Sequence, residues 1–280
     1  LGGFLAGSIR DNLLDIYGQR AIYQGDNAPV NLKISQEVLD LDFLLQEQDN
    51  AYSEVLGKLR SQLVGFYEAK DSANILDSLY LEKDFLGTGV VATSDGWLLT
   101  HQAVLSKMEG VAAVTADKKI YQLQKRIVDP FSGLVLVKIE AKGLSPVKFA
   151  DVSSVPATNG LIVARYSIQN HGSDLVKSYI RKFGYHDQGK GADFLLTTEK
   201  IDRYLKMSAA FDKVYNGAAI INDRNEVAGL LFDSGREQID LGIPSFYLRT
   251  AINNFLSSSD KILRSSLGVN YLDLSETLGL

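Results

Sequence analysis

Short apolar runs separated by turn signals dominate the chain from Ser61 onward, and they limit the possible fold more than any other feature. Each run has four to six residues, which suits a buried strand better than a helix. The runs are 63–67, 89–92, 97–100, 134–139, 161–164, 218–221 and 227–231. Ser94-Asp95-Gly96 and residues 222–225 indicate tight hairpin turns. Because helices do not alternate with these runs, the pattern predicts an antiparallel β-barrel or sandwich.

Helical periodicity is confined to the two ends of the chain. Apolar residues recur at three- and four-residue steps within 9–24 and 39–59, and a Gly- and Pro-containing stretch at 25–29 separates the two segments. A third helix is predicted from Ser245 to Leu256, started by Pro244 and ended by a serine run. Residues 1–7 are uncharged and small or apolar, too few for the ~20 residues of a membrane span. They are either the remnant of an amino-terminal anchor or a terminus that packs locally.

Composition excludes several classes of function. The chain of 280 residues has 45% hydrophobic and 22% charged residues, typical of a globular protein with one large domain or two modest ones. It has no cysteine, which excludes disulfides, thiolate zinc sites and cysteine nucleophiles, and a net charge of -5 argues against a nucleic-acid partner. His101, His171 and His186 lack metal-ligand spacing, and the glycine-rich stretches lack the context of a phosphate-binding loop. Neither a metal nor another cofactor is predicted.

Four blocks in the strand region carry a family resemblance. Residues 87–104 read GTGVVATSDGWLLTHQAV, and the blocks 128–139, 147–153 and 205–218 follow in order. Together they resemble the HtrA (Do/DegP-like) serine proteases, and residues 266–269 resemble the beginning of the PDZ domain that follows many of those proteases. The resemblance covers roughly residues 50–280. It implies a mainly β, two-barrel trypsin/chymotrypsin-like fold, with amino-terminal helices and a carboxy-terminal helix.

The residues at the matching catalytic positions cannot perform acyl transfer. That chemistry needs a hydroxyl nucleophile, an imidazole base, a carboxylate that orients the base, and backbone N–H donors for the oxyanion. By the resemblance, Ala103 stands at the base, Gly133 at the carboxylate and Asn216 at the nucleophile. Val214 replaces the glycine of the oxyanion hole, and a β-branched residue resists unusual backbone angles. The resemblance therefore implies a catalytically inactive member, in which positions 103, 133 and 216 converge at one cleft.

A working endopeptidase with a displaced site remains the alternative. His101 lies two residues before Ala103, on the same face of an extended segment, and so could approach the old site. The nearest serine in the nucleophile block is Ser208, eight residues before Asn216. Ser258 and Lys261 have an S-x-x-K spacing, but the motifs that accompany this pair in serine hydrolases are missing, which favours an ordinary helix end.

The resemblance divides the chain into three parts. Residues 1–60 form a membrane-proximal stub and helical stalk, 61–257 the trypsin-like domain, and 258–280 a linker with the truncated start of a PDZ-like domain. In that family the loop before the first PDZ strand presents backbone N–H groups to a peptide carboxylate. Arg264, Leu267, Gly268 and Val269 lie at the matching place and are the predicted binding residues.

A role in binding follows from these expectations. A protease that has lost its triad can still hold an extended peptide by strand addition, unless the short charged segment between Leu230 and Ile243 closes the cleft. The expected partners are proteins or unfolded peptides, an active HtrA relative in a mixed assembly, or further copies in a trimer. The expected location is a membrane surface on the extracytoplasmic side, reached through the amino-terminal anchor. A purely structural domain is the third alternative.

Overall fold

The structure, a computed structural model, describes nine stretches of the chain. These are residues 57–70, 79–151, 160–169, 173–185, 196–201, 203–258, 261–262, 264–265 and 267–271. The chain divides into two compact units, Leu1–Asp49 and Asn50–Leu280, and every described residue belongs to the second. The stub at 1–7 and the helix predicted at 9–24 lie outside the described residues. Of the helix predicted at 39–59 only 57–59 are described, within a helical turn over 57–60.

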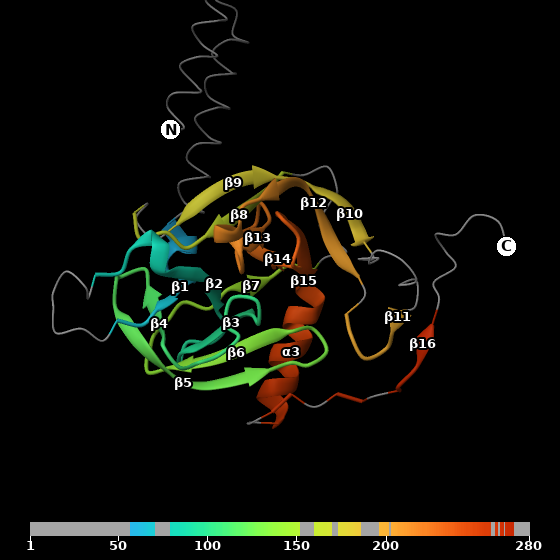
Figure 1. The fold of residues 1–280 in the computed structure, drawn as a ribbon, viewed down its shortest axis with the longest axis horizontal. Helices are drawn as coiled ribbons and strands as arrows, with labels where there is room; N and C mark the ends of the chain where they lie inside the picture. Colours follow the sequence, from blue (N-terminus) through green and yellow to red (C-terminus); the bar gives the residue numbers. More distant parts are fainter. Residues whose placement is uncertain are drawn as a thin grey trace, which may run out of the picture. The chain divides into compact units, whose positions relative to one another are not determined.

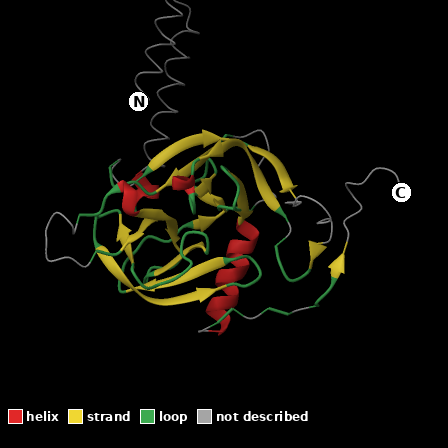
Figure 2. Cartoon of the chain, in the orientation of Figure 1, coloured by secondary structure: helices red, strands yellow, loops and turns green. Residues whose placement is uncertain are grey.

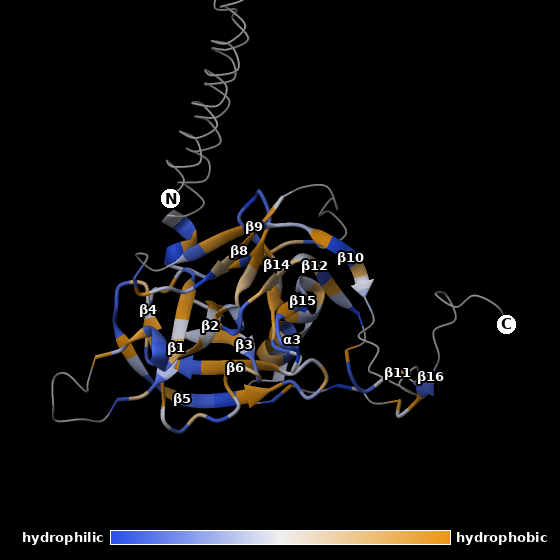
Figure 3. Ribbon diagram, turned by 45° about the horizontal axis from the view of Figure 1, so that its top comes forward, coloured by the Kyte–Doolittle hydropathy of each residue, from blue (hydrophilic) through white to orange (hydrophobic). Residues whose placement is uncertain are grey.

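Six antiparallel strands close into a barrel in the order β1-β2-β3-β6-β5-β4 (Figure 1). They are β1 (Leu63–Glu68), β2 (Phe85–Val91), β3 (Trp97–His101), β4 (Val111–Thr115), β5 (Ile120–Val128) and β6 (Leu134–Ile139). The strand β6 is an apolar run that is buried almost throughout, whereas β5 alternates between exposed and half-buried positions. Figure 3 shows the same contrast, with β6 mostly hydrophobic and the middle of β5 hydrophilic. The hairpin between β2 and β3 turns at Gly96, whose φ is 103°.

A second sheet of eight strands follows the barrel. Its strands are β7 (Lys148–Phe149), β8 (Leu161–Arg165), β9 (Asp174–Ser178), β10 (Ile180–Tyr185), β12 (Tyr204–Phe211), β13 (Ala219–Ile221), β14 (Glu226–Leu231) and β15 (Ile239–Pro244). The order is β10-β12-β15-β14-β13-β8-β9, with β7 parallel to β14. Among the described residues this sheet stays open, so the predicted second barrel is a half-barrel. The mainly β, trypsin-like fold with a carboxy-terminal helix is confirmed.

Short elements complete the described part of the chain (Figure 2). The helix α3 (Ser245–Ser258) begins where predicted and ends two residues later than predicted. Two 3₁₀ turns, η1 (Glu82–Asp84) and η3 (Lys213–Tyr215), precede β2 and β13, and a separate two-stranded ladder pairs β11 (Leu196–Thr197) with β16 (Asn270–Tyr271). No helix in the described stretches is long and apolar enough to cross a bilayer.

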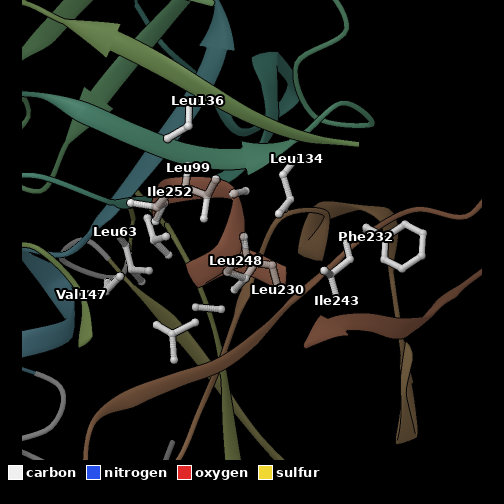
Figure 4. Close-up of a cluster of buried hydrophobic side chains, with 14 of the residues drawn as sticks. Leu63, Leu99, Leu134, Leu136, Val147, Leu230, Phe232, Ile243, Leu248 and Ile252 are labelled. Carbon is white, nitrogen blue, oxygen red and sulfur yellow. The ribbon is translucent and has the colours of Figure 1, made fainter. Parts of the chain in front are cut away.

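One hydrophobic cluster joins the barrel, the second sheet and the helix (Figure 4). Leu99 of β3, Leu230 of β14 and Leu248 of α3 are all fully buried in it. The ring of Trp97 at the start of β3 lies 4.4 Å from that of Phe255 in α3. Because the helix packs against strands of both sheets, it helps to fix the region where the catalytic residues of a trypsin-like fold are expected.

Candidate functional site

Two neighbouring turns of the barrel carry the positions matched to the base and the carboxylate. The turn after β3 contains Ala103, and residues 129–133 join β5 to β6. The N–H of Gln102 donates to the carbonyl oxygen of Gly133 at 2.8 Å, which places the turns side by side. Gly133 has a φ of 70°, and a Cβ atom built on it would lie 2.6 Å from Nε2 of His101. The imidazole of His101 therefore occupies the space that a side chain at position 133 would need.

His101 is held as a neutral, buried ring. The residue is 6% exposed, and its ring lies 5.0 Å from that of Phe232. Its Nδ1 accepts a hydrogen bond from the N–H of Ala103 at 3.1 Å, so the ring proton is on Nε2. Burial lowers the pKa of His101 to about 4, although the nearby charge of Asp233 acts in the opposite direction. A ring nitrogen that already accepts a backbone proton is not free to take one from a hydroxyl, which argues against His101 as a displaced base.

Asn216, at the position matched to the nucleophile, is satisfied by groups of the same chain. It follows η3 and is 6% exposed. Its Oδ1 accepts the N–H of Asp233 at 3.0 Å, and its backbone oxygen accepts the N–H of Thr88 at 2.9 Å. The amide is therefore directed at the segment that follows β14, where it fixes the backbone.

Close contacts bring the three matched positions into one region. Gly217 has a φ of 79°, and a Cβ atom there would lie 2.0 Å from the carbonyl oxygen of Thr88 and 3.0 Å from the side chain of Val104. A Cβ atom at Gly87 would lie 2.7 Å from Val104 and 2.6 Å from the carbonyl oxygen of Asn216. Val104, the neighbour of Ala103, therefore packs against the turn that contains Asn216. The barrel and the second sheet meet at these turns.

The backbone around Val214 is folded into η3. Val214 is 38% exposed, and the N–H of Asn216 donates to the carbonyl oxygen of Lys213 at 3.0 Å. An oxyanion hole of this fold uses the N–H of the nucleophile position, and here that donor is already bonded within the turn.

The loop after β14 is bonded to η3, next to Asn216. The ammonium of Lys213 lies 2.5 Å from a carboxylate oxygen of Asp233 and also donates to the carbonyl oxygen of Arg236. Asp233 also accepts the N–H of Gly235 at 2.8 Å. Partial burial, the largest single effect, acts to raise the pKa of Asp233, but the hydrogen bonds from Lys213 and Gly235 and the charge of Lys213 together outweigh it, so the pKa is lowered. The charged segment between Leu230 and Ile243 is therefore tied to η3 beside Asn216.

The other chemistry-bearing residues predicted from the sequence are placed elsewhere. Ser208 accepts the N–H of Tyr179 at 3.2 Å, which fixes its hydroxyl between β12 and the β9–β10 connection. Ser258 donates to the carbonyl oxygen of Asn254 at 2.6 Å, as a residue at a helix end does. His171 and His186 lie outside the described residues. Within the described residues no cluster of three or more His, Asp or Glu residues could hold a metal ion.

The predicted binding residues near the carboxyl end are engaged by two carboxylates of the same chain. Nε of Arg264 donates to Asp129 at 2.8 Å and Nη2 donates to the second oxygen, while the guanidinium lies 4.6 Å from the ring of Phe131. The N–H groups of Leu267 and Gly268 donate to Oε1 of Glu199 at 3.1 and 2.7 Å. The N–H of Thr198 donates to the carbonyl oxygen of Val269 at 2.9 Å, and the N–H of Val269 donates to the hydroxyl of Thr198 at 3.1 Å.

The pairing of Asp129 and Glu199 with residues near the carboxyl end could not be predicted from local sequence patterns. Asp129 is 135 residues from Arg264, and Glu199 is 69 residues from Gly268. The carboxylate of Asp129 is fully buried, and it also accepts the hydroxyl of Ser132 at 2.6 Å. Arg264 is therefore paired with a buried carboxylate, and the backbone N–H groups of Leu267 and Gly268 are paired with Glu199.

The comparisons with known proteins agree with this fold. The trypsin-like peptidase domain matches residues 87–230, just over half of the chain. The serine endoprotease DegS of Escherichia coli K12 is 23% identical over 200 residues, covering 68% of this chain and 53% of DegS. A probable periplasmic DegP-like serine endoprotease of Rickettsia prowazekii is 25% identical, covering 69% of this chain and 37% of the relative. The structure of the HtrA-type protease AlgW with a decapeptide superimposes with a TM-score of 0.58 at 15% identity, covering 75% of this chain and 68% of AlgW.

The chain therefore belongs to the trypsin-like peptidase domain family. The curated relatives to which it is similar include the serine endoprotease DegS and a DegP-like serine endoprotease. The chain spans about half the length, or less, of these curated relatives.

Proposed function

We propose that this chain is a catalytically inactive HtrA-type protein that binds proteins or unfolded peptides. The observation that carries the proposal is the side chain of Asn216, whose amide oxygen is hydrogen-bonded to the backbone of Asp233. An amide at this position offers no hydroxyl for an acyl intermediate.

The surroundings of Asn216 support the loss of catalysis. The methyl group of Ala103 cannot move a proton, and Gly133 has no carboxylate with which to orient a base. His101 is the one described imidazole nearby, and its lone pair accepts the N–H of Ala103. With the N–H of Asn216 bonded to Lys213, each part of the catalytic machinery is replaced or already occupied.

The proposed binding role and location rest on the similarity of this chain to AlgW and to the curated relatives. AlgW, which shares the fold, was solved with a decapeptide and with a tripeptide, and the Rickettsia relative is named as periplasmic. We propose that this chain likewise meets peptides or unfolded proteins, in an extracytoplasmic compartment and tethered to a membrane in its full-length form. Leu267, Gly268 and Val269 are the proposed ligand-facing residues, while Arg264 fixes their position through Asp129. Assembly as a trimer, alone or with an active HtrA relative, is part of the proposal.

Labelling with a fluorophosphonate tests the absence of catalysis, because this probe reacts only with an activated serine. We expect no labelling and no degradation of unfolded casein, for the wild type and for Asn216→Ser alike. An active HtrA-type protease treated in parallel is the positive control. Labelling of one serine in the wild type, abolished when that serine is changed to alanine, would refute the proposal.

Two further measurements test binding and location. Unfolded casein should co-sediment with the immobilised protein. A folded carrier protein, used as the control, should not. Fractionation of cells that express the natural gene should place the protein with membranes. Recovery only in the soluble cytosolic fraction would overturn the proposed location.

A further inference from the structure

A group of basic side chains lies on β10 and β12, where β10 forms the edge of the second sheet (Figure 1). The group surrounds an open pocket of about 410 Å³ that is lined by Arg181, Lys182, Tyr185 and Lys206. This volume falls in the range of small-molecule sites, ~300–1,000 Å³. Three of the four lining residues are cations, although the chain as a whole has a net charge of -5. The positive charge is therefore concentrated at this pocket rather than spread over a basic protein.

Two irregularities in β10 bring these side chains to the same pocket. In the register with β12, the strand β10 contains one extra residue before Lys182 and another between Lys182 and Tyr185. The second irregularity includes Gly184, whose φ of 62° is the left-handed conformation of a glycine bulge. A β-bulge interrupts the alternation of side chains between the two faces of a strand. The neighbours Arg181 and Lys182 can therefore both line the pocket.

The same register places two lysines directly opposite each other. Lys182 of β10 pairs with Lys206 of β12, and like charges at opposite positions destabilise an antiparallel pair. The ammonium of Lys206 contacts the carboxylate of Asp240 and lies 5.0 Å from the centroid of the Tyr185 ring. Asp240 is also 3.4 Å from the guanidinium of Arg236, so two cations share this one carboxylate. An anion bound between the two lysines would relieve their repulsion.

Protection of the sheet edge does not account for the whole arrangement. Lysines and bulges on an edge strand discourage pairing with a further strand, and β10 is such an edge. Lys206, however, belongs to β12, which pairs with β10 on one side and with β15 on the other. Lys206 protects no edge, yet it lines the pocket together with Arg181 and Lys182. The shared pocket therefore indicates an anionic ligand.

We propose that this pocket binds the phosphate group of a phosphorylated ligand, with Arg181, Lys182 and Lys206 as the donors. A phosphate group has three acceptor oxygens and nearly two negative charges, so it can engage several cations at once, whereas a carboxylate has two oxygens and one charge. The planar guanidinium of Arg181 also suits two phosphate oxygens. The pocket is large enough to hold the group that carries the phosphate, which belongs to a small soluble molecule or to a lipid headgroup. This site is additional to the proposed peptide binding and does not depend on it.

Isothermal titration calorimetry of the full chain with inorganic pyrophosphate, at low salt to limit screening, tests the pocket. Arg181→Gln/Lys182→Gln should weaken binding about tenfold or more, because two charge-assisted contacts are lost. Lys58→Gln/Arg60→Gln removes the same two charges from exposed positions before β1 and is the matched control, which should bind as the wild type does. No binding by the wild type at ~10 mM pyrophosphate, or an equal loss in both double variants, would overturn the proposal.

A variant expected to gain affinity separates the pocket from a general loss of structure. Asp240→Asn removes the carboxylate that competes for Lys206 and repels an incoming anion. We expect this variant to bind pyrophosphate about threefold or more tighter than the wild type. Damage to the fold does not tighten binding, so the gain is specific to the charges of the pocket. An affinity no tighter than that of the wild type would contradict the proposal.

Further probes distinguish the source of the phosphate and exclude a carboxylate ligand. Co-sedimentation with phosphatidylcholine vesicles that contain ~30% phosphatidylglycerol, abolished by Arg181→Gln/Lys182→Gln, would identify a lipid headgroup. Vesicles of phosphatidylcholine alone are the control. Binding of pyrophosphate without co-sedimentation would identify a soluble phosphorylated ligand. A tetra-aspartate peptide that binds more tightly than pyrophosphate would refute the assignment to phosphate.

Discussion

Placing a side chain at position 133 should destabilise the protein, because two separate costs meet there. Gly133 has a φ of 70°, which costs an ordinary residue ~1–2 kcal/mol. In addition, the new Cβ atom would lie 2.6 Å from Nε2 of His101 and 2.9 Å from Nε2 of Gln102. The side chain of Gln102 is exposed and can move, whereas His101 is packed against Phe232 and bonded to Ala103. Forcing the imidazole aside adds about 1–3 kcal/mol, as overpacking of a core does.

Gly143→Ala is the matched control for the backbone cost alone. Gly143 has a φ of 73°, nearly that of Gly133, but no atom lies within 4 Å of a Cβ built on it. We expect Gly143→Ala to lower the free energy of unfolding by ~1–2 kcal/mol and Gly133→Ala by about 2–5 kcal/mol. Gly133→Asp, which would place a carboxylate at this matched position, should cost as much as Gly133→Ala or more.

Urea unfolding followed by tryptophan fluorescence measures these free energies. In a His101→Ala background the cost of Gly133→Ala should fall to that of Gly143→Ala, because the side chain that obstructs the site is gone. Equal destabilisation by Gly133→Ala and Gly143→Ala in the wild-type background would refute the reasoning. It would mean that His101 does not occupy the space beside position 133.

Three further outcomes follow from the same contacts. The pKa of His101 is about 4 in the folded protein, below its ordinary value of 6.5, so its contribution to stability is full above pH 6.5 and is lost as the pH falls toward 4. Over this window the free energy of unfolding of the wild type, measured by urea titration, should fall by roughly 3 kcal/mol relative to that of His101→Gln. Parallel pH profiles of the two proteins would contradict this expectation. Asn216→Ala should cost ~1–3 kcal/mol by stranding the N–H of Asp233, whereas Asn216→Asp, which keeps the acceptor, should cost less in thermal unfolding. Arg264→Met should lower the free energy of unfolding by about 3–5 kcal/mol, because it leaves the buried carboxylate of Asp129 without its charged partner. Adding Asp129→Asn should recover part of that loss, and a double variant no more stable than Arg264→Met would contradict this reasoning.

The continuous apolar strands could be predicted from the sequence, and the mixed ones could not. The run at 134–139 matches β6 residue for residue, and β3 differs from its prediction by one residue at its end. These strands are buried on both faces, so composition alone reveals them. In contrast, β5 and β12 contain Lys, Gln or Ser at positions that are half-buried or exposed, and no apolar run distinguishes them from a loop. Their pairing with distant strands is what makes them strands.

For the candidate site, too, local sequence patterns predict some residues, whereas contacts between residues far apart in the sequence could not be predicted. The resemblance led to the prediction of Ala103, Gly133 and Asn216 as the matched positions, because the blocks that contain them are local in the sequence. The groups that fill the site, however, are joined by contacts over long sequence separations. The bond from Asp233 to Asn216, the ring of Phe232 over His101 and the pair of Arg264 with Asp129 follow from packing, which no local pattern encodes.

The contacts between the barrel and the second sheet near the candidate site do not use the side chains of Ala103, Gly133 and Asn216. The carbonyl oxygen of Thr88 accepts a hydrogen bond from the hydroxyl of Thr100 at 2.8 Å, and the hydroxyl of Thr88 accepts one from the N–H of Tyr166 at 3.0 Å. Gly217 packs against that same carbonyl, where any side chain would collide with it. These contacts join the barrel to the second sheet through backbone atoms and threonine hydroxyls. At the matched position 216 only the backbone carbonyl takes part in this joint, through the N–H of Thr88, so the proposed loss of the triad side chains would leave the joint intact.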